Sequence, residues 1–286
     1  MFLTLIITVG ALQTHAQQEP SKTPKPVVFR EVAEKRLEKR KQKLEDVCPV
    51  DTNIVAARVF KDYGAMFIAS HEVQPPSKCV FADEEEVAAF QKGISFTSQA
   101  IGGRTVELQE AAMKALDKAR AAATKKGLSI TPRGQNASRR GYADTYRIWK
   151  SRFDPALAYW VRNGKISEKD ADKARKMETT DQVIQVIEWE KDSIWFSTGF
   201  NRSIFSSVAA PGTSQHLSGI ALDVAEFSNK QVREILNEHG WFQTIIDDTP
   251  HFTYLGLDED ELPERGLIPA VKDGYTFWIP NFDRDK

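Results

Sequence analysis

The chain has 286 residues, of which 41% are hydrophobic and 28% charged, a composition typical of a soluble globular protein of one or two domains. Its 39 basic and 40 acidic side chains give a formal net charge of -1, which argues against a protein that binds nucleic acid over its whole surface. An aromatic content of 10% excludes a wholly disordered chain.

The first 16 residues are predicted to be an export signal. Residues 2–12 are largely apolar, and the small residues Thr14 and Ala16 fit cleavage after Ala16. This run is shorter than the about 20 residues that a transmembrane helix needs, so we expect a secreted or periplasmic protein without a stable membrane anchor. A signal usually begins with a basic residue, and none occurs before Lys22. A buried apolar strand is therefore the alternative.

If the protein is exported, its two cysteines can form a structural disulfide. Cys48 and Cys79 are predicted to form a disulfide, because exported proteins fold in oxidising surroundings. Closing a loop of about 30 residues would stabilise the fold by roughly 3 to 4 kcal/mol in the chain-entropy model. Two unpaired buried thiols are the alternative.

Residues 17–47 are predicted to be a tether followed by a charged helix. Residues 17–28 are rich in Gln, Lys, Ser and Pro and show no periodicity. Residues 30–47 are mostly charged, so we expect a solvated helix with pairs such as Glu31 with Lys35. The basic excess of this helix could also favour an anionic polymer, although a solvated face explains it as well.

Residues 48–100 are predicted to be a small N-terminal subdomain without recognisable chemistry. In it, residues 55–69 look strand-like and residues 80–90 look helical, with two prolines at 75–76 as a break.

Three helices are expected next. Residues 106–126 place apolar side chains at three- and four-residue intervals, which predicts an amphipathic helix that ends at Gly127 and precedes a short strand at 128–130. Residues 142–162 predict a second helix, whose aromatic stripe is typical of a core. Residues 181–190 predict a third.

A strand is expected in the second half of residues 214–224, where the pattern has period two. Ile220, Leu222 and Val224 form an apolar face for the core. The other face has Asp223 as its functional group, flanked by small side chains.

A second strand is expected at residues 251–255, with His251 on the face opposite to its aromatic residues. Two strands can therefore bring His216, Asp223 and His251 to one place. With only two cysteines and five histidines, a metal site must come from such residues. Two histidines and one carboxylate, with a position left for water, are the ligand set of a catalytic zinc site.

Zinc chemistry also needs a carboxylate that moves a proton from water to the leaving amine. Asp248 is the candidate, since it lies three residues before His251 and Pro250 stiffens the turn between them. Asp247 is the alternative.

The motif Ser-x-His-x-x-Gly-x-Ala-x-Asp at residues 214–223, followed by Pro-His-Phe-x-Tyr at residues 250–254, resembles the zinc D-alanyl-D-alanine carboxypeptidase family. That family includes vancomycin-resistance D,D-carboxypeptidases and phage L-alanyl-D-glutamate endolysins. The resemblance covers about residues 106–257. It implies that His216, Asp223 and His251 bind Zn2+ and that the acidic residue three before the last histidine is the general base. The carboxypeptidases usually have Glu there, whereas Asp248 is similar to the endolysins.

The family also has an arginine, in a Ser-Gly-Tyr-Arg-Ser type of motif, that is thought to hold the substrate. Arg133 stands at the corresponding place after the strand predicted at 128–130, although Pro132 replaces the expected aromatic residue. A guanidinium suits a D-Ala carboxylate because it donates two parallel hydrogen bonds. The alternatives are Arg139, Arg140 and Arg202.

The resemblance implies a hedgehog/DD-peptidase-like α+β fold for residues 101–286, with a small, mainly antiparallel sheet and packed helices. We therefore predict a secreted or periplasmic bacterial zinc metallopeptidase that hydrolyses peptidoglycan stem peptides, with D-alanyl-D-alanine carboxypeptidase as the first expectation. A stem-peptide endopeptidase of the L-alanyl-D-glutamate type and a non-catalytic, zinc-containing cell-wall-binding protein are the alternatives. The scissile bond, the native metal, the oligomeric state and the role of residues 17–100 stay open.

Overall fold

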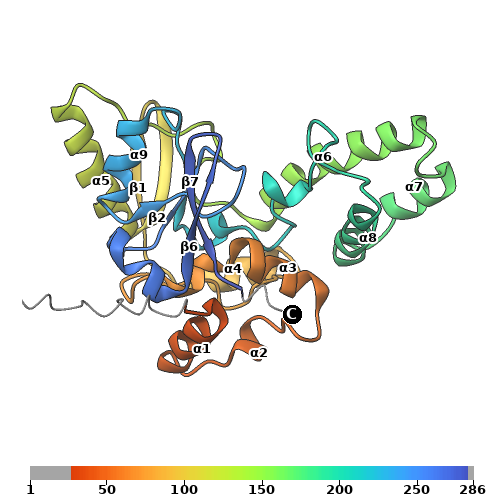
Figure 1. The fold of residues 1–286 in the computed structure, drawn as a ribbon, viewed down its shortest axis with the longest axis horizontal. Coiled ribbons are helices and arrows are strands. Elements are labelled where there is room, and N and C mark those ends of the chain that lie inside the picture. The colour runs from red at the N-terminus through yellow and green to blue at the C-terminus, as the bar shows by residue number, and fades with distance from the viewer. Residues whose placement is uncertain (1–26, 283–286) are drawn as a thin grey trace, which may run out of the picture.

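The computed structural model describes residues 27–282, so the predicted export signal and most of the predicted tether lie outside the described residues. Helices and short antiparallel strands are mixed along this part of the chain (Figure 1). The architecture is therefore α+β, as predicted. No helix within residues 27–282 is long and apolar enough to cross a membrane.

Helices make up most of the regular structure. They are α1 (Phe29–Lys39), α2 (Leu44–Val47), α3 (Ile54–Tyr63), α4 (Glu84–Lys92), α5 (Glu110–Lys125), α6 (Tyr142–Arg162), α7 (Glu168–Arg175), α8 (Thr179–Lys191) and α9 (Lys230–Asn237). In Figure 1, α6, α7 and α8 extend to one side of the molecule, away from α5 and α9.

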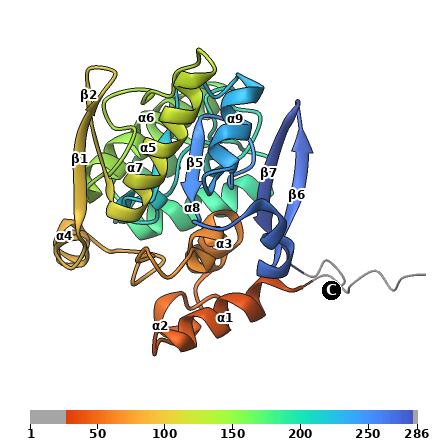
Figure 2. The same cartoon turned by 90° about the vertical axis from the view of Figure 1, so that its left-hand side faces the viewer.

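The strands of the described chain form three separate antiparallel sheets. They are β1 (Phe96–Ile101), β2 (Arg104–Gln109), β3 (Ala221–Asp223), β4 (Trp241–Phe242), β5 (His251–Tyr254), β6 (Leu267–Lys272) and β7 (Tyr275–Pro280). Two sheets are the hairpins β1–β2 and β6–β7, which lie on opposite sides of the molecule in Figure 2. The third has the order β3-β5-β4.

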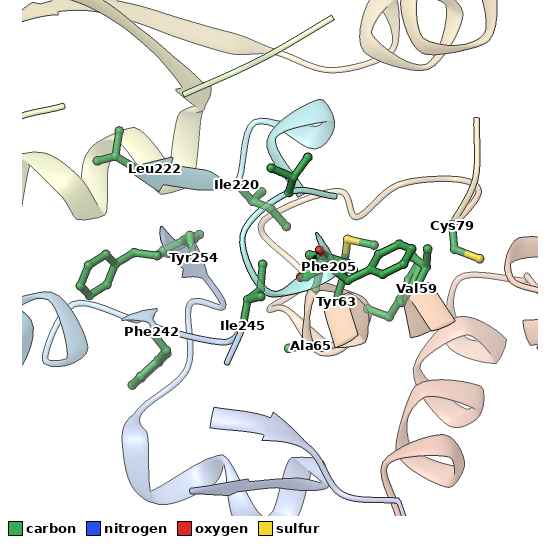
Figure 3. Packing of buried hydrophobic residues seen from close by; sticks show 14 of the residues in the cluster. Val59, Tyr63, Ala65, Cys79, Phe205, Ile220, Leu222, Phe242, Ile245 and Tyr254 are labelled. Carbon is green, nitrogen blue, oxygen red and sulfur yellow. Dashed lines mark hydrogen bonds between the residues drawn. The ribbon is translucent and has the colours of Figure 1, made fainter. Parts of the chain in front are cut away.

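The three-stranded sheet is fixed to the core by its apolar face. Ile220, Leu222 and Val224 are at most 1% exposed, as the alternation along this segment predicts. Figure 3 shows Ile220 and Leu222 in one packed region with side chains of β4, β5 and α3. This burial fixes which side chains of β3 point to the other face.

Two of the predicted helices agree closely with the structure. The helix α6 has the predicted bounds, and its Trp149 and Phe153 are fully buried. The helix α8 extends the predicted segment by two residues at its start and one at its end.

The predicted helix over residues 106–126 is wrong at its start. Residues 104–109 form β2, and the helix α5 begins only at Glu110. Val106 and Leu108 are fully buried and alternate with more exposed residues, which is the period of a strand. Gly127 follows the end of α5 with a φ of 71°, as expected. Residues 128–130 are not a strand; only Pro132 forms a bridge, with Val224.

The strand-like interpretation of residues 55–69 is also wrong, since α3 and a 3-10 turn at Gly64–Ile68 occupy this segment. The Asn53 side chain caps α3 by accepting hydrogen bonds from the amides of Val55 and Ala56. The buried residues of α3, Val55, Ala56, Val59, Phe60 and Tyr63, recur at the spacing of one helix face, which the strand-like interpretation overlooked. The predicted helix near residues 80–90 is present as α4.

The charged N-terminal helix is less solvated than predicted. In α1, Phe29, Ala33 and Leu37 recur every fourth residue and are fully buried. Arg30 pairs with Glu34 on the exposed side, and the predicted pair of Glu31 with Lys35 is not among the ion pairs of residues 27–282. Amphipathic packing therefore ties this helix to the core.

Cys48 and Cys79 form the predicted disulfide. It joins the end of α2 to the segment that leads into α4. The boundary predicted between residues 100 and 101 falls within the β1–β2 hairpin, and one cluster of buried residues extends from Phe29 to Trp278. The division into a subdomain of residues 48–100 and a domain of residues 101–286 stays a prediction.

Removing the disulfide with the double substitution Cys48→Ser and Cys79→Ser should lower the free energy of unfolding by about 3 to 4 kcal/mol, because the unfolded chain regains the freedom of a loop of some 30 residues. Urea denaturation of both proteins measures the difference. Thiol titration provides the control: the parent should show no free thiol until it is unfolded with reductant, and two thiols in the untreated parent would contradict the bond.

Candidate metal centre

The central sheet brings two distant parts of the chain together. The strands β3 and β5 are antiparallel, and Asp223 is directly opposite His251. Side chains at paired positions lie on the same face, with Cβ atoms about 4.5 to 5.5 Å apart. The carboxylate and the imidazole therefore meet on the face away from the apolar core.

The third member comes from the turn before β3. The 3-10 turn Gln215–Ser218 holds His216, and the Ser214 hydroxyl caps this turn by accepting a hydrogen bond from the His216 amide. The turn ends at Gly219 with a φ of 66°. A Cβ at that position would lie 2.5 Å from the Phe96 ring, so both conformation and space require glycine.

The donor atoms of His216, Asp223 and His251 form a compact triangle, here called the donor triad. Nε2 of His216 is 3.1 Å from Nδ1 of His251, and each is 3.4 Å from Oδ1 of Asp223. A tetrahedral zinc site with bonds of about 2.0 to 2.1 Å separates its donors by roughly 3.3 to 3.4 Å. The donor triad therefore fits three corners of such a site and leaves the fourth for water or substrate.

The protonation states of His216 and Asp223 suit a cation. Burial lowers the pKa of His216 to about 4, and the nearby Arg140 guanidinium acts in the same direction, so the imidazole is neutral at pH 7. Burial alone would raise the pKa of Asp223, but His216, His251 and Arg140 together hold it well below its usual range. Lone pairs on neutral imidazole and ionised carboxylate are what a metal ligand must offer.

Both imidazoles are oriented by a second hydrogen bond. Nδ1 of His216 lies 2.8 Å from the Ser138 carbonyl oxygen, which only a protonated nitrogen can bond. Nε2 of His251 lies 2.8 Å from Oε1 of Gln215. The Gln215 amide in turn donates to the Tyr63 carbonyl at 2.9 Å, which fixes its orientation. These bonds leave Nε2 of His216 and Nδ1 of His251 free for the metal.

Gln215 and Ser138 were missed by the sequence analysis. Gln215 lies inside the motif, next to His216, but it stands at a position where the motif Ser-x-His-x-x-Gly-x-Ala-x-Asp specifies no residue type. The interaction of Gln215 with β5 depends on pairing across the sheet, which local sequence does not contain.

The donor triad lies in a cleft of about 380 Å³, referred to below as the cleft. Its walls come from the donor triad, the turn before β5, the segment between α5 and α6 and one face of α6. Asp248 and Arg133 also line it. The sequence-predicted site residues are thus brought to one place.

Asp248 and Asp247 are in different surroundings, although they are neighbours. Lys272 holds the Asp247 carboxylate at 2.6 Å, with Arg202 at 3.7 Å. No hydrogen bond or ion pair of the Asp248 carboxylate is found among residues 27–282. Burial raises the pKa of Asp248 to about 7, against the lowering effect of His251. Of these two neighbouring carboxylates, Asp248 is therefore the one without a cationic partner in the described chain and with a pKa near neutrality.

The four arginines that the sequence offered as substrate-binding candidates lie in different surroundings. Arg133 is exposed at the cleft, with its guanidinium 5.0 Å from the centre of the Phe227 ring. Arg140 donates to Oδ2 of Asp223 at 2.6 Å, so it is engaged with the donor triad. Arg139 pairs with Glu107 outside the cleft, and Arg202 lines a neighbouring cavity.

Comparisons with known proteins gave only distant structural similarity. No family model matches the chain, and no curated protein matches it. The structure is similar to a mutant of the vancomycin-resistance D,D-pentapeptidase VanY in complex with Zn(II), with 16% identity, a TM-score of 0.34 and coverage of 57% of this chain and 79% of that one. VanYB in complex with D-alanine-D-alanine gives 16% identity, a TM-score of 0.36 and coverage of 60% and 84%.

The LdcB LD-carboxypeptidase is a third similar structure, with 18% identity, a TM-score of 0.29 and coverage of 57% of this chain and 64% of that one. The names of these structures agree with the family that the motifs resemble. At such TM-scores the overlap carries no weight on its own, and the residues of the cleft must carry the functional assignment.

Substituting Gln215→Leu should lower zinc affinity about 10- to 100-fold, because His251 loses the acceptor that fixes its orientation. Competition with a chromophoric chelator measures the affinity. Gln182→Leu is the matched control, since Gln182 is a buried amide that bonds Trp149 in α6, away from the cleft. Equal zinc affinity in the parent and Gln215→Leu would contradict the orienting role.

Proposed function

We propose that the protein is a zinc-dependent peptidase of the bacterial cell envelope that hydrolyses peptidoglycan stem peptides. The activity that we propose first is the release of terminal D-Ala. The observation that carries the proposal is the donor triad with tetrahedral spacing beside Asp248, a partly buried carboxylate without a partner among the described residues. The motif resemblance supplies the substrate class.

His216, Asp223 and His251 would hold the metal. When bound, zinc supplies Lewis-acid polarisation of the scissile carbonyl and activation of water near neutral pH. Arg140 keeps Asp223 ionised through its 2.6 Å ion pair, and the bonds to Ser138 and Gln215 keep the imidazoles in the ligating tautomers.

Asp248 would move the proton. It accepts a proton from the attacking water and returns it to the nitrogen of the leaving amine, so that the peptide bond breaks as a neutral amine departs. A carboxyl with a pKa raised toward 7 is suited to both halves of this transfer.

Arg133 would bind the substrate. Its exposed guanidinium at the cleft can donate two parallel hydrogen bonds to a D-Ala carboxylate. Packing on Phe227 limits the motion of this side chain and so reduces the entropy lost on binding.

Secretion or a periplasmic location is part of the proposal. The Cys48–Cys79 disulfide supports it, because disulfides persist in oxidising compartments and are rare in the cytosol. Residues 1–16, which would direct export, lie outside the described part of the chain.

Metal content tests the assignment of the donor triad. Elemental analysis should find about one zinc per chain in the purified parent and none in His216→Ala, and D-Ala release from a pentapeptide should be lost with the metal. A parent that takes up no zinc on reconstitution would remove the enzymatic assignment and favour a wall-binding protein. Mass spectrometry of the products distinguishes loss of terminal D-Ala from an internal cut.

The role of Asp248 is tested by Asp248→Asn, which keeps the shape of the side chain but removes the base. We expect kcat to fall by about 10²- to 10⁴-fold with zinc content unchanged. Asp247→Asn is the matched control and should keep most activity, because Asp247 is engaged by Lys272. If Asp247→Asn inactivated the enzyme and Asp248→Asn did not, the two roles would be exchanged.

A further inference from the structure

The helix α6 contributes a wall to the cleft that the sequence motifs do not include. Thr145, Ile148 and Arg152 line the cleft, and their spacing places them on one face of the helix. From this wall α6 continues toward α7 and α8 on one side of the molecule (Figure 1). The cleft therefore has a cationic side chain, Arg152, that lies outside the motifs at residues 214–223 and 250–254.

Arg152 has hydrogen-bonding capacity that the protein itself does not use. Its side chain is partly buried, and the Nε atom is buried without a hydrogen-bond partner. Its Nη1 bonds only the neighbouring Ser151, whose hydroxyl is 3.0 Å away. No carboxylate forms an ion pair with Arg152 among residues 27–282. A guanidinium with unpaired donors can therefore gain a partner from a bound ligand, which raises the affinity for that ligand.

The other charges of the cleft have partners or assigned roles. Arg140 is paired with Asp223, and Asp247 is paired with Lys272. The proposed function gives Arg133 to the terminal carboxylate of the substrate. Arg152 is then a second guanidinium in the cleft without an acidic partner in the described chain, beside an apolar neighbour, Ile148. This arrangement suits a carboxylate on a short aliphatic side chain.

We propose that Arg152 is a specificity-determining residue that binds a second carboxylate of the peptide, on an acidic residue at a distance from the end held by Arg133. The proposal rests on the proposed function, because it takes a stem peptide as the occupant of the cleft. The proposal narrows the substrate class. Peptides that have both an acidic residue and a free C-terminal carboxylate should be preferred over peptides in which the carboxylate of that acidic residue is amidated.

The test uses two synthetic stem peptides that differ only at the acidic residue, which is glutamate in one and glutamine in the other. Zinc-loaded parent, Arg152→Gln and Arg147→Gln are assayed with both. Arg147 is on the same helix, but its side chain is 64% exposed and it does not line the cleft, so its variant is the matched control.

We expect the parent and Arg147→Gln to prefer the acidic peptide. In Arg152→Gln, KM for the acidic peptide should rise about 10- to 100-fold with kcat nearly unchanged, and KM for the amidated peptide should stay the same. Arg152→Lys should recover part of the preference, because it keeps the charge but not the two-pronged geometry. An equal rise in KM for both peptides, or an unchanged preference in Arg152→Gln, would overturn the proposal.

Failure of the proposed function would be recognisable separately. If the parent hydrolyses neither peptide, calorimetric binding of the same two peptides to the zinc-loaded protein replaces KM as the measurement. A preference for the acidic peptide that is lost only in Arg152→Gln would still support the role of Arg152, and binding without preference would refute it. Thermal unfolding of each variant checks that the helix is intact.

Discussion

The antiparallel pairing of β3 with β5 is the constraint on which the rest of this structure depends. It sets Asp223 opposite His251, and the turn before β3 adds His216. The register is held by Leu222 and Phe252, which are paired on the buried face. A slip of one residue would bury the carboxylate and expose the apolar side chains, so the hydrophobic core itself protects the geometry of the donor triad.

The charges around the donor triad are arranged so that each buried group has a defined state. Removing an ion from water costs several kcal/mol, and a buried carboxylate is tolerated only with partners. Asp223 has Arg140 on one oxygen and the two imidazoles near the other. Arg140 also disfavours a charged His216, so one guanidinium favours both the neutral imidazole and the ionised carboxylate. Asp248 is only partly buried and lacks such a partner in the described chain, and its pKa is raised to about 7 instead of being held low.

The cleft is composite, because its walls come from segments far apart in the chain. The motif segments supply the donor triad and Asp248, whereas α6 supplies Arg152 and Ile148. The helix is anchored by fully buried aromatic residues, Trp149 and Phe153, that follow the same periodicity as the cleft-lining face. One helix can therefore serve the core with one face and the cleft with another.

The sequence by itself determined the features that depend on local spacing. The period-two strands, the bounds of α6 and the donor triad could be predicted from residue types at short intervals or from a motif, and the disulfide from the presence of two cysteines in a chain expected to be exported. The tertiary structure decided that residues 104–109 form a strand, where Arg104–Gln109 pairs with Phe96–Ile101, and that residues 54–63 form a helix, whose buried face packs in the core. It also decided that Arg140 pairs with Asp223 and that Gln215 and Arg152 belong to the cleft. Such contacts join residues that are distant along the chain, and no local pattern encodes them.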